Sequence, residues 1–336
     1  MVPFVHTFIC AVAMICIGAM QAGAYTPACT GTNLMDELAR EKPEDFQEIL
    51  TDGTREANAN ALLWKIEKSD TAASYLFGTM HVTDKRLRDV PEEVRDALNH
   101  ASTVAVENLD VMDEAKTQLK LRALAGQMTF LDGTDLRDHL DEGEQSVLRE
   151  AARKFQLSFA QVIKLKPWMA ASLLALPLCE KQRKAAGEPF LDKAIVERAR
   201  ANNAELVSLE TIAEQINAMA SLPMPAQVAF LTSSARLATK SEDFLETMIA
   251  LYLERKIGAI SAMARYFAGN DATVSDAYEE FHQKLVTKRN LVMLERALPL
   301  LQDGKVFIAV GALHLSGEHG LVELFRNEGY TVTPVW

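Results

Sequence analysis

Two short apolar runs, one near each end of the chain, are each followed by a Gly-x-x-His tetrad. The runs Ser74–Phe77 and Val306–Val310 have the length and the bounded apolar character of buried strands. A glycine directly after each run lets the backbone turn sharply, so that the next polar side chain faces a cleft. The tetrads are Gly78–His81 and Gly311–His314. Their histidines are therefore expected to enter one shared site from equivalent strand ends.

The same order of elements follows both tetrads. After the first, a pattern that predicts a helix begins at Pro91 and leads to a strand-like run, Thr103–Glu107. After the second, Gly320–Phe325 has helical periodicity and Tyr330–Val335 has the pattern of a strand. Each end of the chain thus predicts strand, turn, helix and strand, which is a βαβ-type unit repeated once at long range.

The middle of the chain is expected to be almost entirely helical. Apolar residues recur there at spacings of three and four, for example from Leu245 to Ile260. An exception is the strand candidate Glu205–Leu209, which ends at Glu210 and follows a helix that begins near Asp192. We therefore predict an α/β fold in which two βαβ-type repeat halves form a shared sheet core with a long, mainly helical insertion. The expected single domain, residues 25–336, contains the first half (62–110), the insertion (111–301) and the second half (302–336).

The first 24 residues have the features of an export signal. They contain no Lys, Arg, Asp or Glu, and an apolar run from Phe8 to Met20 precedes the small residues Ala22–Ala24. Cleavage is expected after Ala24 and would release a periplasmic or secreted protein. No stretch reaches the length of about 20 uncharged apolar residues that crosses a bilayer, so no stable membrane span is expected. A retained amino-terminal anchor is the alternative, because no basic residue precedes the apolar run.

Charge and cysteine content narrow the classes of partner. The chain has 46 acidic and 35 basic residues, all beyond the signal, and a net charge of −11. Such a chain is not expected to bind the phosphate backbone of a nucleic acid. Cys29 and Cys179 remain after cleavage, and in an oxidising compartment they either form a disulfide or stay as two buried thiols. Neither belongs to a metal-binding Cys-x-x-Cys pair.

Two imidazoles with one or two carboxylates form a ligand set for a divalent cation. His81 and His314 are joined by Glu107 and Glu210, each of which ends a predicted strand, where a buried carboxylate is costly unless paired or coordinated. This set suits Zn²⁺, Mn²⁺, Co²⁺ or Fe²⁺, and such ions activate water for hydrolysis. The alternative for either glutamate is a salt bridge or a helix cap. The sequence has no serine-hydrolase elbow, P-loop or dinucleotide-binding glycine motif.

Six motifs along the chain recur in the order and spacing of a known family. They are Leu76–Val82, Val104–Glu107, Lys166–Trp168, Ser208–Gln215, Arg289-Asn290 and Val310–Gly317. Together they resemble the TraB/GumN family, to which the animal Tiki proteases are related, and the resemblance extends from about Leu62 to the last residue. It implies an α/β core distantly similar to the ChaN and erythromycin-esterase-like folds. The Tiki branch is a protease that depends on Mn²⁺ or Co²⁺ and clips the amino terminus of secreted Wnt proteins.

The resemblance also implies roles for the histidines and glutamates. His81 and His314 match the two motif histidines of the family, and Glu107 and Glu210 match its acidic positions. Both histidines and one glutamate would hold the metal, while the other glutamate would act as general base on a bound water. The sequence does not decide which glutamate takes which role, so both are candidate ligands and candidate catalytic residues.

Three further positions take their interpretation from the same resemblance. Arg289 and Asn290 match an Arg-Asn pair of the family. Arg289 would stabilise a developing oxyanion, and Asn290 would either orient the substrate or cap a helix. The role of Asp192 is left open, because Pro189–Leu191 precedes it where the family often carries a glycine.

Three functions are compatible with these residues. The leading hypothesis is an exported metal-dependent hydrolase, most simply a peptidase, whose substrate is a peptide or an envelope protein. The first alternative is haem binding, because ChaN-like folds bind haem and either His81 or His314 would serve as an axial ligand. The second is an envelope protein that binds peptides, or assists polysaccharide export, without catalysis.

Overall fold

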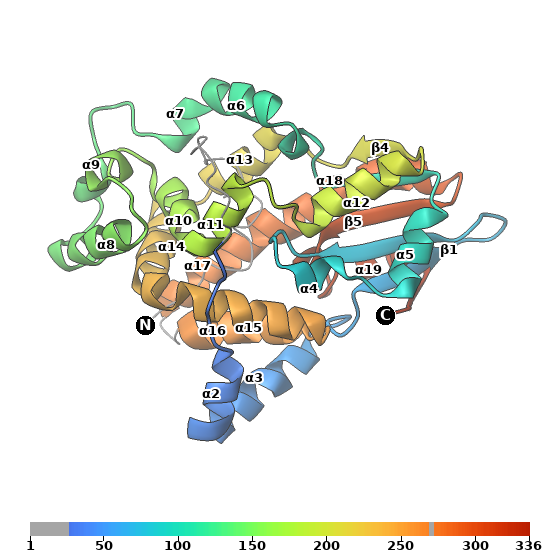
Figure 1. Cartoon of the computed structure of the whole chain (residues 1–336), viewed down its shortest axis with the longest axis horizontal. Coiled ribbons are helices and arrows are strands. Elements are labelled where there is room, and N and C mark those ends of the chain that lie inside the picture. The colour runs from blue at the N-terminus through green and yellow to red at the C-terminus, as the bar shows by residue number, and fades with distance from the viewer. Residues whose placement is uncertain (1–26, 269–271) are drawn as a thin grey trace.

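A six-stranded mixed sheet forms the centre of the α/β core, on the right of Figure 1. The computed structural model describes residues 27–268 and 272–336, so the expected signal and its cleavage site after Ala24 lie outside the described residues. The strands are β1 (Leu63–Glu67), β2 (Ser74–Thr79), β3 (Thr103–Val106), β4 (Glu205–Ser208), β5 (Val306–Gly311) and β6 (Thr331–Pro334). Their order across the sheet is β4-β3-β5-β2-β1-β6.

Four neighbouring strands, β4, β3, β5 and β2, run parallel to one another. The other two, β1 and β6, continue the sheet with antiparallel pairings. β5 lies between β2 and β3, so a strand from the end of the chain separates two strands from its first half. Because the carboxyl ends of parallel strands meet at one edge of a sheet, the residues that follow these four strands are brought together there.

Helices cover both faces of the sheet. The covering helices are α5 (Glu92–Asn99) and α12 (Leu191–Ala201) on one face and α18 (Lys288–Leu301) and α19 (Leu321–Asn327) on the other. Side chains alternate between the two faces along β5, so that Phe307 packs in the cluster beneath α5 and α12, and Ile308 in the cluster beneath α18 and α19. Burial on both faces explains why β5 is apolar throughout its length.

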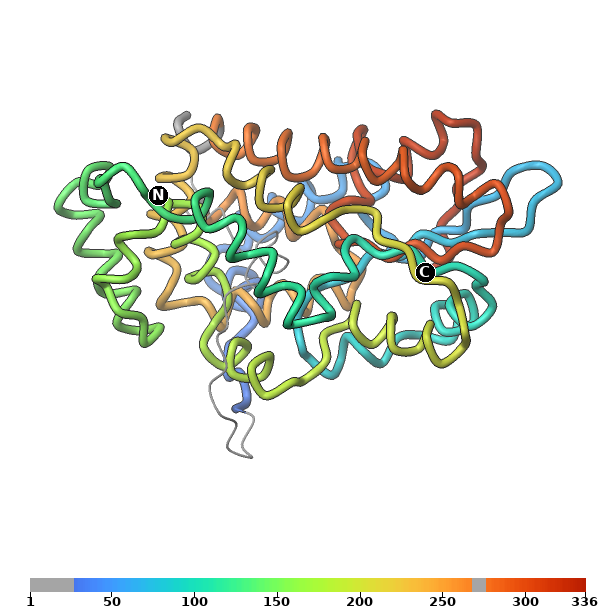
Figure 2. The backbone as a smooth tube through the Cα atoms, turned by 90° about the horizontal axis from the view of Figure 1, so that it is seen from above, coloured from blue at the N-terminus to red at the C-terminus, as the bar shows by residue number. Residues whose placement is uncertain are grey.

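The remaining helices form a group beside the sheet, which Figure 2 shows from a second direction. The α-helices are α2 (Leu34–Glu41), α3 (Pro43–Arg55), α4 (Lys85–Arg88), α6 (Glu114–Ala123), α7 (Ala125–Met128), α8 (Glu142–Lys154), α9 (Phe159–Val162), α10 (Pro167–Ala175), α11 (Leu178–Ala185), α13 (Ile212–Ala220), α14 (Met224–Leu237), α15 (Ser241–Leu253), α16 (Ile257–Ala268) and α17 (Ala272–His282). Short 3₁₀ turns occupy Asp110–Met112, Leu136–Asp138, Ala238–Lys240 and Ala312–His314, and a π-helical turn, Gln283–Thr287, leads into α18. α14 packs against α8, α10 and α17, and Trp168 of α10 is fully buried.

The predicted fold class is confirmed, with two differences in detail. The sequence pattern did not single out β1, a five-residue strand in which Leu63, Trp64 and Ile66 are buried and the two charged residues are partly exposed. The helical pattern from Leu245 to Ile260 is divided between α15 and α16. The break occurs at Arg255, which adopts a left-handed φ of 60° and whose backbone N–H bonds to the carbonyl of Tyr252 to close α15.

The two cysteines that remain beyond the expected signal are joined. Cys29 and Cys179 form a disulfide that links residues 150 positions apart, with their Cα atoms separated by 5.4 Å. Of the two alternatives that the sequence allows, the structure therefore has the bridge, a bond typical of oxidising compartments. Within residues 27–268 and 272–336, no helix is both long and apolar enough to span a membrane.

Candidate active site

The candidate site lies where the four parallel strands end. Glu210 follows β4 and Glu107 follows β3. The Gly-x-x-His tetrads begin within the last residues of β2 and β5, because these strands continue through Gly78 and Gly311 and do not end before them as expected. β2 and β5 are adjacent and in a register that places Thr79 opposite Gly311, so the two tetrads lie side by side. A continuous series of contacts links all six residues that the sequence proposed: His81, His314, Glu107, Glu210, Arg289 and Asn290.

The His81 ring is held at one nitrogen and faces the site with the other. Its Nδ1 lies 2.8 Å from Oδ2 of Asp192, and its Nε2 lies 3.6 Å from Oε1 of Glu107. Thr79 donates its hydroxyl to the other oxygen of Asp192 at 2.7 Å, which fixes that carboxylate. Burial by itself would lower the pKa of His81, but the charge and hydrogen bond of Asp192, with Glu107, raise it to about 10.

The His314 ring is fixed in the same manner by a neutral partner. Its Nδ1 lies 2.6 Å from Oδ1 of Asn290, whose amide nitrogen donates to the carbonyl oxygens of His314 and His319. Because the Asn290 oxygen can only accept, Nδ1 carries the hydrogen and Nε2 carries the lone pair. That Nε2 lies 3.9 Å from Oε1 of Glu107. Burial and the positive charge of Arg289 lower the pKa of His314 to about 3, so the ring is neutral at pH 7.

Glu107 stands at the centre of the contacts. Its Oε1 accepts the backbone N–H of Gly311 at 2.6 Å, and its Oε2 accepts from Nη2 of Arg289 at 2.8 Å. Burial would raise the pKa of Glu107, but Arg289 and the two imidazoles hold it well below the usual value. The carboxylate is therefore ionised at neutral pH, with one oxygen turned toward both histidines.

Glu210 is the second carboxylate that pairs with Arg289. Both of its oxygens accept from Nε of Arg289, at 2.8 and 3.0 Å, and the Glu210 residue is only 1% exposed. Gln215 bridges the two glutamates through Nε2, which lies 3.4 Å from an oxygen of each. Arg289 also donates from Nη1 to the carbonyl of Leu285, so each of its three nitrogens is hydrogen-bonded.

Three of these atoms are of the kind that binds divalent cations, once His81 has released the proton that its raised pKa retains. They are Nε2 of His81, Nε2 of His314 and Oε1 of Glu107, the last lying 3.6 and 3.9 Å from the two nitrogens. Two ligand atoms about 2.1 Å from a tetrahedral cation lie about 3.4 Å apart, so small shifts would bring these donors to that spacing. Among the described residues, no group of three or more His, Cys, Asp or Glu side chains is arranged so that it could hold a metal ion as it stands.

Sequence reasoning missed part of this arrangement. Asp192, whose role the sequence left open, is 3% exposed and contacts His81 from a position 111 residues away. Its only local signal is its place in the first turn of α12, which is common for any aspartate. Gln215 lies within a motif that carried the family resemblance, but nothing in the sequence indicates that its amide faces Glu107 and Glu210.

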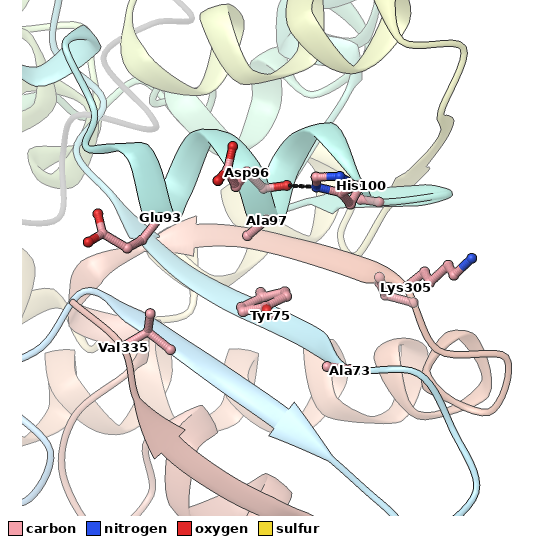
Figure 3. A pocket seen from close by; sticks show the side chains of 10 residues that line it. Ala73, Tyr75, Glu93, Asp96, Ala97, His100, Lys305 and Val335 are labelled. Atoms are coloured by element: carbon pink, nitrogen blue, oxygen red, sulfur yellow. Dashed lines mark hydrogen bonds between the residues drawn. The ribbon is translucent and has the colours of Figure 1, made fainter.

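A separate pocket lies at the opposite end of the sheet. It has a volume of about 370 Å³ and is formed where β2 and β5 begin, beside α5 (Figure 3). Tyr75, Asp96 and His100 line it, and Nδ1 of His100 is hydrogen-bonded to the carbonyl of Asp96. Because the candidate site lies at the carboxyl ends of the same strands, His100 belongs to a different region from His81 and His314.

Comparison with known proteins shows the family of this chain. Residues 62–334 match the model of the TraB/PrgY/gumN family, a range that includes every residue described above at the strand ends. The chain belongs to the TraB/PrgY/gumN family. The family resemblance inferred from the six sequence motifs is thereby confirmed. No solved structure matches this family member significantly.

Curated relatives of this family member include animal metalloproteases. The "Metalloprotease TIKI homolog" of Nematostella vectensis is 22% identical over 330 residues, covering 84% of this chain and 68% of the relative. "Metalloprotease TIKI2" of Xenopus tropicalis is 24% identical over 355 residues, covering 90% of this chain and 65% of the relative. "Uncharacterized protein YbaP" of Shigella flexneri is 22% identical over 254 residues, covering 75% and 88%. The chain thus spans about two thirds of the length of these two metalloproteases.

Proposed function

We propose that this chain is an exported metal-dependent peptidase that cleaves a peptide or an envelope protein. The observation that carries the proposal is that Nε2 of His81 and Nε2 of His314 both face Oε1 of Glu107, at 3.6 and 3.9 Å. The similarity to proteins named as metalloproteases supports the same reaction class. The ion is Mn²⁺, Co²⁺, Zn²⁺ or Fe²⁺, because each is bound by imidazole and carboxylate ligands.

In this proposal His81, His314 and Glu107 hold the ion, and their neighbours orient them. When bound, the ion would supply Lewis-acid activation of a water molecule and of the peptide carbonyl. Asp192 and Asn290 fix the two rings through Nδ1. Because the rings are already oriented, they lose little rotational freedom when their Nε2 atoms bind the ion. Glu107 is favoured over Glu210 as the carboxylate ligand, because only Glu107 has an oxygen near both imidazoles among the contacts described.

Glu107, Arg289 and Glu210 form a chain of ion pairs. Arg289 holds Glu107 ionised, and Glu210 balances the buried guanidinium. Glu210 would act as general base through a lone pair that Arg289 does not use, since both of its oxygens accept guanidinium hydrogen bonds. Arg289 donates to Glu107, Glu210 and the carbonyl of Leu285, so an oxyanion would compete with these acceptors for its hydrogens.

Metal content is the first test of this proposal. Mature protein is purified without chelator, incubated with each ion and freed of excess ion. Its metal content is then measured by plasma mass spectrometry beside that of a His81→Ala/His314→Ala double variant. We expect near-stoichiometric metal in the wild type and its loss in the double variant. A His100→Ala/His139→Ala variant is the matched control and is expected to retain metal, because His100 is exposed and His139 stacks on Phe130. Wild-type protein that holds no metal with any of the four ions would overturn the proposal.

Peptidase activity is tested separately with a quenched fluorescent peptide library. We expect cleavage that requires the divalent ion and stops with chelator. Glu107→Gln is expected to lose both metal and turnover, whereas Glu210→Gln is expected to retain metal and lose turnover. Peptide binding that persists without any cleavage, in wild type and in the double histidine variant alike, would favour a non-catalytic binding protein.

Export is part of the proposal and has its own test. The features that support it are the apolar run before Ala24 and the disulfide between Cys29 and Cys179. Amino-terminal sequencing of protein recovered from the periplasm or medium of an expressing bacterium is expected to begin at Tyr25. Recovery of uncleaved protein in the membrane fraction would support the retained anchor instead.

A further inference from the structure

The loop that carries His81 is held mainly by charged side chains of one short helix. This loop, residues 80–84, connects β2 to α4 and is here called the His81 loop. Lys184 of α11 donates from Nζ to the carbonyl oxygen of His81 at 2.7 Å. Glu180 of α11 accepts from the backbone N–H and the hydroxyl of Thr83, both at 2.7 Å. One turn of α11 therefore supplies three hydrogen bonds to the loop.

Both charges are removed from water in order to make these contacts. Glu180 is 0% exposed and the side chain of Lys184 is 7% exposed, and their charged atoms lie 3.9 Å apart. Burying a charge is costly unless it is paired and hydrogen-bonded, and the loop provides most of the remaining partners. The position of the loop and the position of α11 are consequently coupled, because separating them leaves two buried charges with fewer partners.

α11 is in turn fixed to the start of the described chain. Cys179, directly before Glu180, is bonded to Cys29. Arg183, one turn further along α11, donates from Nε to the carbonyl of Pro27 at 2.9 Å. Residues 27–33, here called the amino-terminal strap, therefore contact the same helix that holds the His81 loop.

The strap is also fixed at its other end, to the beginning of α15. The backbone N–H of Thr30 donates to Glu242 at 2.7 Å, and that of Thr32 donates to Asp243 at 2.8 Å. Gly31 lies so close to the backbone of Glu242 that an added Cβ would come within 2.0 Å of its carbonyl oxygen. These contacts fix the course of the strap between α15 and α11.

α15 contacts residues just before and just after the His81 loop. The hydroxyl of Tyr252 donates to the carbonyl of Gly78 at 2.6 Å, near the end of β2 and just before the loop. Beyond the loop, Arg86 of α4 makes a bidentate ion pair with Glu246 of α15, at 2.8 and 2.6 Å. α11 and α15 thus enclose the segment from Gly78 to Arg86, and the strap joins these two helices.

We propose that Glu180 and Lys184 are positioning residues for His81, and that the Cys29–Cys179 disulfide fixes their helix so that the His81 loop keeps its place. The catalytic consequence rests on the proposed function, because a displaced His81 matters for turnover only if it holds the metal. The structural consequence is independent of the proposed function. When the disulfide is broken, the His81 loop gains flexibility before the sheet does.

Hydrogen exchange of metal-free protein, read by mass spectrometry, tests the structural consequence directly. Dithiothreitol supplies the two electrons and two protons that convert the disulfide to two thiols, and it becomes a cyclic disulfide itself. The amide of Thr83 is the reporter, because Glu180 accepts its hydrogen. On reduction we expect its exchange to rise at least about tenfold, the factor that corresponds to one hydrogen bond to a charged group. A peptide from 321–334, which contains α19 and the edge strand β6, is expected to change little.

Three variants separate the disulfide from the helix that it holds. Cys29→Ser/Cys179→Ser is expected to exchange at Thr83 like reduced wild type and to be insensitive to dithiothreitol. Glu180→Ala, with the disulfide intact, is expected to raise Thr83 exchange as well, and Glu180→Gln to raise it less. Glu150→Gln is the control substitution, because that side chain is 72% exposed on α8.

Two results would overturn the inference. One is unchanged exchange at Thr83 after reduction and in Glu180→Ala. The other is an equal increase in exchange in the 321–334 peptide, which would show that the disulfide acts on the whole fold.

Metal affinity of oxidised and reduced protein, measured by calorimetry with Mn²⁺, then tests the catalytic consequence. A protein that binds no metal removes that consequence and the proposed function, while the exchange result stands or fails independently.

Discussion

At the scale of single residues, each imidazole of the site has one nitrogen fixed by a neighbour and the other directed at Glu107. The partner of His81 is the carboxylate of Asp192, and the partner of His314 is the amide oxygen of Asn290. The surroundings of the two rings shift their pKa values in opposite directions. The pKa of His81 is raised to about 10, whereas that of His314 is lowered to about 3 by burial and a nearby guanidinium.

Asp192→Asn is predicted to weaken metal binding. The variant keeps the size of the side chain but removes the charge that orients His81, and loss of such an outer partner typically costs about 10- to 100-fold in metal affinity. Calorimetry with Mn²⁺ measures the affinity, and NMR titration of the metal-free variant is expected to place the pKa of His81 below its wild-type value. Asp303→Asn, an exposed position outside the site, is the control. Unchanged metal affinity would contradict this role for Asp192.

The two histidines predict opposite pH dependences of stability in metal-free protein. His314 has a pKa near 6.5 in the unfolded chain and about 3 in the folded chain. Between these pH values the unfolded chain therefore binds a proton that the folded chain does not bind. The free energy of unfolding therefore falls on acidification through this window. His81 has the reverse sign: its contribution is complete below about pH 6.5 and is lost as the pH rises to about 10.

Urea unfolding of metal-free wild type, His314→Gln and His81→Gln across this range checks both signs. His314→Gln is expected to lose less stability than wild type between pH 7 and about pH 4. His81→Gln is expected to lose less than wild type between pH 7 and about pH 10. Parallel curves for all three proteins would mean that neither histidine has a shifted pKa.

At the scale of elements, the glycine of the second tetrad has a role beyond the turn. Gly311 ends β5 with φ −54°, a conformation open to any residue, so its backbone does not by itself require glycine. Its N–H donates to Glu107, and a Cβ placed there would lie 3.1 Å from Oε1 of Glu107 and 3.4 Å from Nε2 of His81. Glycine at this strand end thus keeps open the space between the donor atoms.

Gly311→Ala is predicted to reduce metal binding without unfolding the protein. The added methyl group enters the space shared by Glu107 and His81, while the backbone conformation remains allowed for alanine. Metal content by mass spectrometry and the thermal unfolding midpoint give the two readouts. Gly143→Ala is a comparison variant in helix α8, away from the site. A Gly311→Ala protein with full metal content would show that the space is not used.

At the scale of the whole molecule, the two Gly-x-x-His halves are interleaved in one sheet. β5, from the second half, lies between β2 and β3 of the first, and β6 pairs with β1 at the far side. β4, from the insertion, extends the sheet beyond β3. Neither half therefore has a complete sheet of its own, and the site exists only when both are present.

A chain that stops at residue 301 is predicted not to fold cooperatively. Without β5, strands β2 and β3 lose their shared neighbour and the apolar side chains of Phe307 and Ile308 leave both clusters. Near-ultraviolet circular dichroism during urea titration is expected to show one transition for the full-length chain and none for the shortened one. A cooperative transition in the shortened chain would indicate that the first 301 residues form an independent domain.

The sequence by itself determined the local elements and the principal candidates for chemistry. Short apolar runs predicted β2 and β5, because a strand buried on both faces needs apolar residues throughout. Gly-x-x-His placed an imidazole just after each strand end, and Glu107 and Glu210 followed runs that are strands β3 and β4. These inferences depend on neighbours along the chain, which a sequence pattern records directly. The functional roles of these residues stay predictions.

Only the tertiary structure decided which residues meet. Asp192 contacts His81 across 111 positions, Arg289 contacts Glu107 across 182, and Cys29 is bonded to Cys179 across 150. The order of strands is likewise set by how the helices and both sheet faces pack, not by any local run. An aspartate in a first helical turn has the same local sequence whether it faces water or the ring of His81, because the difference lies in the elements that pack around it.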